Sequence, residues 1–196
     1  IRLRNALNDR EQVLLHGQQL FKSLLLATQG LDDQSLVLRN IKPVTIRVAK
    51  DYGQVVFCDL RSATKVQEAK GLESCISAPY SSDKFIETNT YELDSSHRDY
   101  WSVGLILLEI IVGSEMVLTS GSYLGVKRVL QVVERYLDAE TLVLLKGMLF
   151  CHKDIDILKY ISEPLTSKPE LIAQNIRRVQ AAATDDAVLQ QFVADV

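Results

Sequence analysis

The hydrophobic pattern is most pronounced in residues 99–113, which read DYWSVGLILLEIIVG. Nearly every position over 100–112 is apolar, and Glu109 is the one charged residue among them. A helix that is hydrophobic on all sides must be buried on all sides. The run is also too short to cross a bilayer, which takes about 20 apolar residues. The pattern therefore predicts a buried central helix over residues 99–112 of a helical domain.

A one-sided pattern occurs earlier in the chain, over residues 9–29. Apolar residues recur there at helical spacing: Leu14, Leu15, Leu20, Phe21, Leu24, Leu25 and Leu26. Asp9 followed by Gln12 is typical of a capping box at a helix start. Gly30 is a residue that commonly follows a helix end. We therefore expect an amphipathic helix over residues 9–29.

The spacing of apolar residues changes after residue 35 from a helical to a strand-like pattern. Three apolar residues alternate with polar ones, and a β-branched and aromatic run follows: Val44, Ile46, Val48, Val55, Val56 and Phe57. The residues Asp51, Tyr52 and Gly53 between the two groups are a turn signal. The pattern predicts a β-hairpin. Residues 61–89 show no clear period and are expected to form a long ordered loop.

The C-terminal third is helical in pattern. Two helices are predicted over residues 126–137 and 139–150, with Asp138 as the cap of the second. Ser167 with Glu170 marks a further helix start, followed by an apolar stripe: Leu171, Ile172, Ile176 and Val179. Such a stripe either binds a partner or packs on its own domain, and both uses remain open. A last helix is expected from Thr184.

Composition limits the classes of protein to consider. The chain has 196 residues, 47% of them hydrophobic and 24% charged, which suits one globular domain. A net charge of −3 gives no reason to expect nucleic-acid or anionic-membrane partners. The three cysteines, Cys58, Cys75 and Cys151, are odd in number and widely spaced, which argues against a disulfide framework or a zinc site. We expect an intracellular protein, cytoplasmic or cytoskeleton-associated, without a membrane span. A secreted effector stays open.

The order of helix, hairpin, long loop, buried helix and further helices resembles the C-terminal lobe of the eukaryotic protein kinases. The buried stretch is similar to that family's D-x-W-S-x-G-x-x-x-x-E pattern, which falls on Asp99, Trp101, Ser102, Gly104 and Glu109. The resemblance implies that these residues are structural. It implies a mainly α fold with one small β-hairpin, a protein-kinase-like C-lobe.

Three further motifs occur in the family's order. Residues 38–45 (LRNIKPVT) stand where kinases carry H-R-D-x-K-x-x-N, residues 59–61 (DLR) where they carry D-F-G, and residues 78–80 (APY) where they carry A-P-E. Each motif alone is weak, and the order and spacing together carry the resemblance. The residues His97, Arg98 and Asp99 also spell H-R-D, but they lead directly into the buried helix and are interpreted as structural.

The resemblance divides the chain into a lobe over residues 1–164 and a C-terminal helical extension over 165–196. The implied parts of the lobe are the helix 9–29, the degraded catalytic loop and hairpin 35–61, the activation-like segment 62–98, the buried central helix 99–112 and further helices over 126–162. Neither a Gly-rich phosphate loop nor a V-A-I-K strand occurs in the sequence. A kinase small lobe either lies upstream of Ile1 or is missing altogether, and both possibilities remain open.

The departures from the kinase motifs bear on chemistry. Asn40 stands at the position of the catalytic Asp, and an amide cannot act as a general base at neutral pH. Thr45 replaces the metal-binding Asn, Leu38 the loop His, and Arg61 the flexible Gly of D-F-G. We expect no catalytic residues in the degraded loop, whose members are Leu38, Arg39, Asn40, Lys42 and Thr45.

Asp59 and Lys42 are the remaining candidates for cofactor contact. Asp59 is either a vestigial cation ligand or a turn residue, and Lys42 is either a phosphate contact or a surface lysine. No metal is expected, with Asp59 the one candidate. ATP with magnesium is considered only if a small lobe exists outside this chain.

Structural roles are also implied by the resemblance. Asp99 should accept backbone N–H groups of the degraded loop, with Arg39 beneath it, and Ala78 and Pro79 should shape the end of the activation-like segment. Tyr80 replaces a Glu whose Arg partner is missing from residues 152–156. Hydrophobic or hydrogen-bonded packing is expected in place of that ion pair.

The resemblance and the departures together predict a catalytically inactive pseudokinase that serves as a protein-interaction scaffold or allosteric regulator, with other proteins as partners. Two alternatives remain open. One is a structural subunit of a large assembly, and the other is an atypical active kinase-like phosphotransferase that uses Asp59.

The buried-helix assignment can be tested by truncating its largest side chain. Trp101→Ala should lower the free energy of unfolding by about 3–5 kcal/mol, because the lost ring leaves a cavity. Urea denaturation measures the change. A variant that unfolds at the parent's urea midpoint would place Trp101 outside the core.

Overall fold

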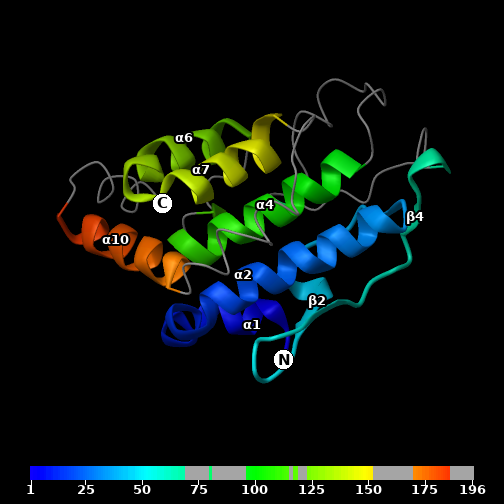
Figure 1. The fold of residues 1–196 in the computed structure, drawn as a ribbon, viewed down its shortest axis with the longest axis horizontal. Helices are drawn as coiled ribbons and strands as arrows, with labels where there is room; N and C mark the ends of the chain where they lie inside the picture. The colour runs from blue at the N-terminus through cyan, green and yellow to red at the C-terminus, as the bar shows by residue number, and fades with distance from the viewer. Residues whose placement is uncertain (69–79, 81–95, 115–116, 119–122, 152–169, 186–196) are drawn as a thin grey trace.

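The computed structural model describes residues 1–68, 80, 96–114, 117–118, 123–151 and 170–185. It confirms a mainly helical fold, with two small antiparallel strand pairs (Figure 1). The helices are α1 (Leu3–Asn8), α2 (Arg10–Asp33), α4 (Ser96–Val112), α6 (Tyr123–Val133), α7 (Ala139–Lys146) and α10 (Leu171–Asp185). The strands are β1 (Leu36–Val37), β2 (Ile46–Val48), β3 (Val55–Phe57) and β4 (Thr64–Lys65). Shorter turns are η1 (Pro43–Thr45), η2 (Val66–Glu68), η3 (Glu134–Tyr136) and the π-helical η4 (Gly147–Cys151).

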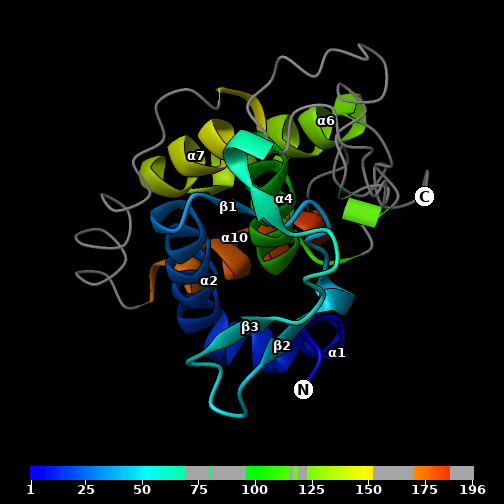
Figure 2. The ribbon, with the colours of Figure 1, turned by 90° about the vertical axis from the view of Figure 1, so that its right-hand side faces the viewer.

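Helix α4 lies at the centre of the described structure. Figure 2 shows α2, α10, α6 and α7 around it, with α1 and the β2–β3 hairpin on the side of α2 away from α6 and α7. Every residue of α4 over 101–111 is buried, including the one acidic residue among them, Glu109. This confirms the buried central helix predicted over 99–112. The helix begins three residues earlier, at Ser96.

Helix α2 begins where the sequence predicts, because the Asp9 side chain accepts a hydrogen bond from the N–H of Gln12. The expected end at residue 29 is wrong, since α2 continues through Gly30 to Asp33. One glycine costs a helix only about 1 kcal/mol. A hydrogen bond from Gln29 to Asp33 (2.8 Å) supports the last turn, and Leu31 packs against the core.

Helix α1 was not predicted from the sequence. It is six residues long, too short to produce a clear period, and three of them are buried: Leu3, Ala6 and Leu7. It contacts α2, η1 and β2. Asp9 separates α1 from α2 and caps both, because its N–H donates to the carbonyl of Ala6.

The predicted hairpin is confirmed as β2 and β3, which pair antiparallel with Ile46 opposite Phe57 and Val48 opposite Val55. At its turn, Tyr52 adopts a positive φ of 59° and the N–H of Gly53 donates to Asp51. Val44 lies in η1 and is exposed, so the alternation begins at Ile46.

A second strand pair corrects the expectation of one hairpin. Strand β1 pairs antiparallel with β4, Leu36 opposite Lys65 and Val37 opposite Thr64. Strand β4 lies in the stretch expected to be loop. Strands of two residues are too short to show an alternation of apolar and polar residues. Their pairing depends on which segments the fold brings together, so the sequence does not predict it.

Helix α7 lies within its predicted span of 139–150, whereas α6 begins three residues before the predicted start at 126 and ends at Val133, where the short turn η3 follows it. Asp138 caps α7 by accepting from the N–H of Thr141 at 2.9 Å, as predicted. Asn175 of α10 completes this cap, since its amide donates to Asp138 (2.6 Å) and its oxygen accepts the Asp138 N–H (3.1 Å). The predicted helices extend to residue 162, but residues 152–162 lie outside the described ranges.

The apolar stripe of α10 is buried, and α10 contacts α2 and α4. The N–H of Ile172 donates to Gln18 of α2 at 2.9 Å. In the described residues the stripe therefore packs on its own domain. Thr184 belongs to α10, where its hydroxyl donates to the carbonyl of Gln180, so a new helix does not begin there. Among the described helices, none is long and apolar enough to cross a membrane.

Gly104 lies where α4 packs against η4. A Cβ at this position would lie 2.9 Å from Met148 Cβ and 3.2 Å from a methyl group of Leu149. The glycine of the W-S-x-G pattern is therefore explained by packing. An added methyl group would force the two elements apart.

This contact predicts opposite effects at two glycines. Gly104→Ala should lower the free energy of unfolding by about 1–3 kcal/mol through overpacking. The matched control is Gly30→Ala, where nothing lies within 4 Å of the new Cβ. That change should raise stability by about 0.4–1 kcal/mol, because alanine reduces the freedom of the unfolded chain. Thermal denaturation of both variants measures the difference, and equal effects would contradict the packing assignment.

Candidate functional site

The degraded loop is held in place by Asp99, in the first turn of α4. Its Oδ2 accepts the N–H of Leu38 at 2.6 Å, and its Oδ1 accepts the N–H of Arg39 at 2.9 Å. Arg39 has a positive φ of 60°, an unfavourable conformation for a residue with a side chain. Two successive N–H groups converging on one carboxylate stabilise this backbone shape. This is the contact that the resemblance implied for Asp99.

The Arg39 side chain ties the loop to the segment after β3. Its Nε donates to the carbonyl of Ser62 at 2.9 Å. Asp99 thus binds the backbone of Arg39, and the guanidinium binds a second segment. These two contacts hold the loop against the segment that follows the D-L-R residues.

Thr45 closes the loop on itself. Its hydroxyl lies 3.0 Å from the carbonyl of Asn40 and 2.9 Å from that of Lys42, and it accepts the N–H of Lys42 at 3.2 Å. A hydroxyl carries one hydrogen, so the two carbonyls share it. The polar group of Thr45 is therefore used within the loop.

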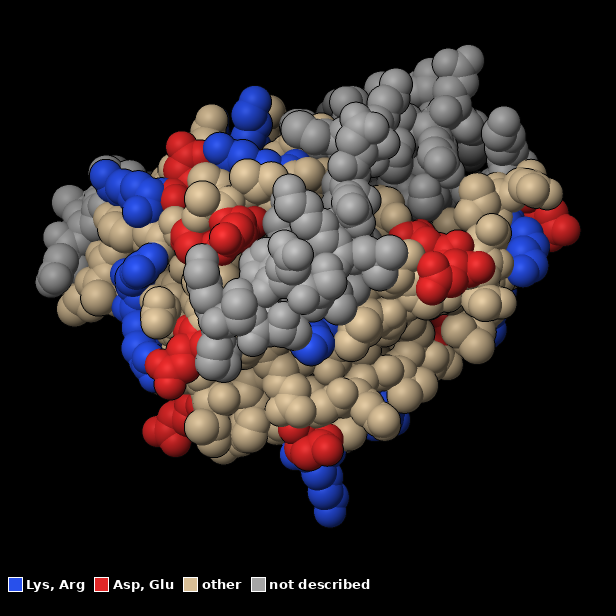
Figure 3. Space-filling model, viewed as in Figure 1, with Lys and Arg blue, Asp and Glu red and all other residues tan. Residues whose placement is uncertain are grey.

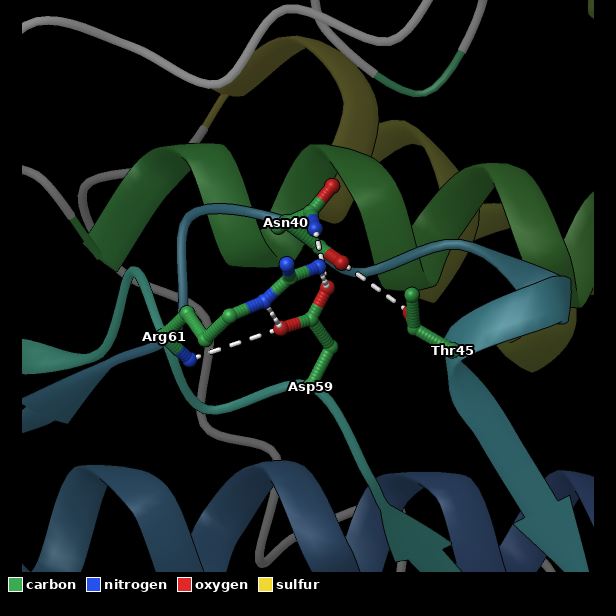
Figure 4. Close-up of polar contacts among 4 residues, drawn as sticks. All are labelled: Asn40, Thr45, Asp59 and Arg61. Atoms are coloured by element: carbon green, nitrogen blue, oxygen red, sulfur yellow. Dashed lines mark hydrogen bonds and ion pairs between the residues drawn. The ribbon is translucent and has the colours of Figure 1, made fainter.

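Asn40, Asp59 and Arg61 point toward one another, while the Thr45 side chain turns toward the backbone of Asn40 (Figure 4). Asn40 Nδ2 donates to Asp59 Oδ2 at 3.0 Å. Arg61 binds both carboxylate oxygens, Nε to Oδ1 at 2.9 Å and Nη2 to Oδ2 at 3.0 Å. This fork-like contact is the strong geometry for an arginine and a carboxylate.

These contacts favour the ionised form of Asp59. Hydrogen bonding by Arg61 is the main cause that lowers its pKa to about 2, with a smaller contribution from Asn40, and partial burial acts in the opposite direction. A carboxyl with a lowered pKa stabilises the folded state above its unfolded pKa. The contact is therefore complete at neutral pH and is lost as the pH falls toward 2.

Asn40 is constrained by this arrangement. Its Nδ2 faces Asp59, which leaves Oδ1 buried without a hydrogen-bond partner among the described residues. An unsatisfied buried acceptor is unfavourable. The orientation is fixed because a carboxylate accepts hydrogen bonds and would repel the amide oxygen.

The loop residues do not fit a magnesium ion in this arrangement. Magnesium requires oxygen ligands in near-octahedral geometry. Asn40 presents its NH₂ group to Asp59, Thr45 directs its hydroxyl to backbone carbonyls, and both oxygens of Asp59 accept hydrogen bonds. Over the described ranges, the structure contains no cluster of three or more His, Cys, Asp or Glu residues suited to a metal.

A second polar network lies inside the core. Glu109 of α4 is fully buried and is paired with Arg4 of α1. The Tyr80 hydroxyl accepts from Arg4 and donates to Glu109 at 2.8 Å. Burial, followed by the charge of Glu109, raises the pKa of the Tyr80 phenol. Tyr80 is thus hydrogen-bonded, while Ala78, Pro79 and residues 152–156 lie outside the described part.

The residues of the W-S-x-G pattern have structural roles beside this network. Trp101 packs edge-on against Phe150 with ring centres 6.2 Å apart. The Ser102 hydroxyl donates to the carbonyl of Tyr80 at 2.7 Å. The sequence alone showed Glu109 as an isolated charge on an apolar helix, a signal for a buried partner. It did not identify Arg4, because α1 was not predicted.

The network predicts a large effect from removing its cation. Arg4→Met should lower the free energy of unfolding by about 3–5 kcal/mol, because Glu109 would remain buried without its partner. Urea denaturation measures the loss. The matched control is Arg2→Met, which removes an exposed arginine immediately before α1 and should change stability by about 0.5 kcal/mol or less. Equal effects would show that Glu109 does not depend on Arg4.

Comparison with known proteins relates the chain to kinases over about half its length. No protein-family profile matches it. It is 37% identical over 93 residues to a probable myosin light chain kinase of Dictyostelium discoideum, covering 47% of this chain and 19% of the relative. It is 34% identical over 98 residues to sperm motility kinase 3A of Mus musculus, covering 50% and 19%. The matched part spans about a fifth of these kinases. The helical fold with small strand pairs is that of a kinase-like C-lobe.

Proposed function

We propose that this chain is a catalytically inactive, kinase-like domain that binds other proteins as a scaffold or an allosteric regulator. The relationship to kinases supports the origin of the domain. The state of the degraded loop supports its inactivity. The proposal concerns this chain, because the matched part is a small share of each related kinase.

The observation that best supports this proposal is that the polar side chains of Asn40 and Thr45 are hydrogen-bonded to other groups of the protein. At the position of the catalytic base, Asn40 donates to Asp59. At the position of a metal ligand, the Thr45 hydroxyl bonds to loop carbonyls. An amide does not take up a proton at neutral pH, and phosphoryl transfer depends on positioned metal ions and a positioned nucleophile. Inactivity is supported because position 40 carries no base and the Thr45 hydroxyl is already hydrogen-bonded to loop carbonyls.

Protein partners fit the surface better than nucleic acids. On the described part of the face in Figure 3, acidic and basic side chains are interspersed among neutral ones, whereas nucleic-acid binding requires a basic patch. Three large apolar side chains are exposed along residues 44–60: Val44, Val56 and Leu60. We also propose an intracellular location, because the exposed thiol of Cys58 is one that a reducing compartment preserves.

The alternative with a specific observation in its favour is an atypical active enzyme, because Asp59 retains its carboxylate. The two functions are distinguished by thermal-shift titration of the 196-residue chain with ATP, with and without magnesium, followed by a phosphotransfer assay. The inactive domain should give no magnesium-dependent shift and no transfer. A shift of several degrees, or transfer that Asp59→Asn abolishes, would favour the enzyme.

Restoring the kinase residues provides a second test. Asn40→Asp combined with Thr45→Asn should still give no phosphotransfer. The new carboxylate would replace a donor 3.0 Å from Asp59, and two adjacent carboxylates repel each other and raise a pKa. The melting temperature should therefore fall at neutral pH and recover relative to the parent as the pH falls below about 4. The control Asn5→Asp makes the same change at an exposed site of α1 and should leave the melting temperature nearly unchanged.

A further inference from the structure

The carboxylate of Asp59 uses all of its hydrogen-bonding capacity within the protein. Oδ1 accepts from Nε and from the backbone N–H of Arg61, and Oδ2 accepts from Arg61 Nη2 and Asn40 Nδ2. A carboxylate offers about four lone-pair sites. Arg61 therefore takes three of them and Asn40 takes one, which leaves none for a metal ion.

Arg61 makes this contact from the surface. Its side chain is 89% exposed, whereas that of Asp59 is 16% exposed. It reaches back only two residues to Asp59, so this contact is local in the sequence. Exposed ion pairs are weak and reversible. Arg61 is therefore a local competitor for the carboxylate.

We propose that Arg61 is a tethered cation that keeps divalent metal ions off Asp59. This deepens the proposed function, on which it rests, by naming a residue that would keep metal ions from the site. Arg61 stands where the kinase resemblance places a glycine, and a glycine has no side chain to cover the carboxylate. A guanidinium and a divalent ion are both positive, so they cannot share one carboxylate without repulsion.

Mn²⁺ alone is the probe for this competition. The free ion is measured by electron spin resonance in titrations of the parent chain and of Arg61→Ala. Removing the guanidinium should tighten Mn²⁺ binding by roughly fivefold, the upper range for loss of an exposed ion pair. Arg61→Lys keeps a positive charge without the fork, so its affinity should lie between those of the parent and Arg61→Ala.

Two controls separate the contact from general electrostatics. Arg47→Ala removes an exposed arginine from β2, opposite Val56 and outside the Asp59 contact. It should leave Mn²⁺ binding at the parental level. Arg61→Ala combined with Asp59→Asn should lose the gain seen with Arg61→Ala alone. Because exposed ion pairs contribute little to stability, the Arg61 variants should melt only slightly below the parent. A cooperative melting transition in each variant shows that its titration reports on folded protein.

Parental affinity in Arg61→Ala would overturn the inference, and so would an equal gain in Arg47→Ala. These outcomes are separate from the test of the proposed function. Phosphotransfer by the parent chain would refute inactivity even if Arg61→Ala binds Mn²⁺ more tightly. Conversely, an inactive parent whose Mn²⁺ affinity does not respond to Arg61 would leave inactivity standing and remove Arg61 as its cause.

Discussion

Complete burial of α4 is the constraint on which the rest of the structure depends. A polar group inside the core must find a partner, because an unpaired buried charge costs several kcal/mol. Asp99 is matched by the backbone N–H groups of the loop, and Glu109 by Arg4 and Tyr80. Near the C-terminal end of α4, the carbonyl oxygens of Ile110 and Ile111 each accept a hydrogen bond from Arg10 at 3.0 Å. A positive charge at this end of a helix also interacts favourably with the helix dipole. Each partner comes from a different segment, so α4 organises the lobe.

This constraint separates the shape of the loop from its chemistry. Asp99 binds backbone N–H groups, which are present whatever the side chains are. The loop can therefore keep its path while the residues at the catalytic and metal positions change. Asn40 and Thr45 then satisfy their polar groups inside the protein. A fold and the chemistry of a site on it depend on different atoms, so a kinase-like lobe can keep its shape while its polar side chains are bonded within the protein.

At the surface, Arg61 likewise satisfies a polar group from within the protein. A side chain two residues from Asp59 supplies the positive charge and the hydrogen bonds that the carboxylate would otherwise seek from ions and solvent. The contact is visible only in the structure. The sequence D-L-R shows that Asp59 and Arg61 are two residues apart. It does not show that the arginine side chain turns back and binds both carboxylate oxygens of Asp59. The proposed inactivity and the proposed metal exclusion thus concern one cluster and remain separable by experiment.

The sequence by itself determined α2, α4, the β2–β3 hairpin and the caps at Asp9 and Asp138, because each depends on residues within a few positions of one another. The tertiary structure decided the rest. Helix α1 and the β1–β4 pair are too short to leave a period, and Gly30 stays helical because the next turn packs on the core. The Arg4–Glu109 contact joins residues 105 positions apart. Its geometry depends on how the whole chain packs, for which local sequence carries no signal.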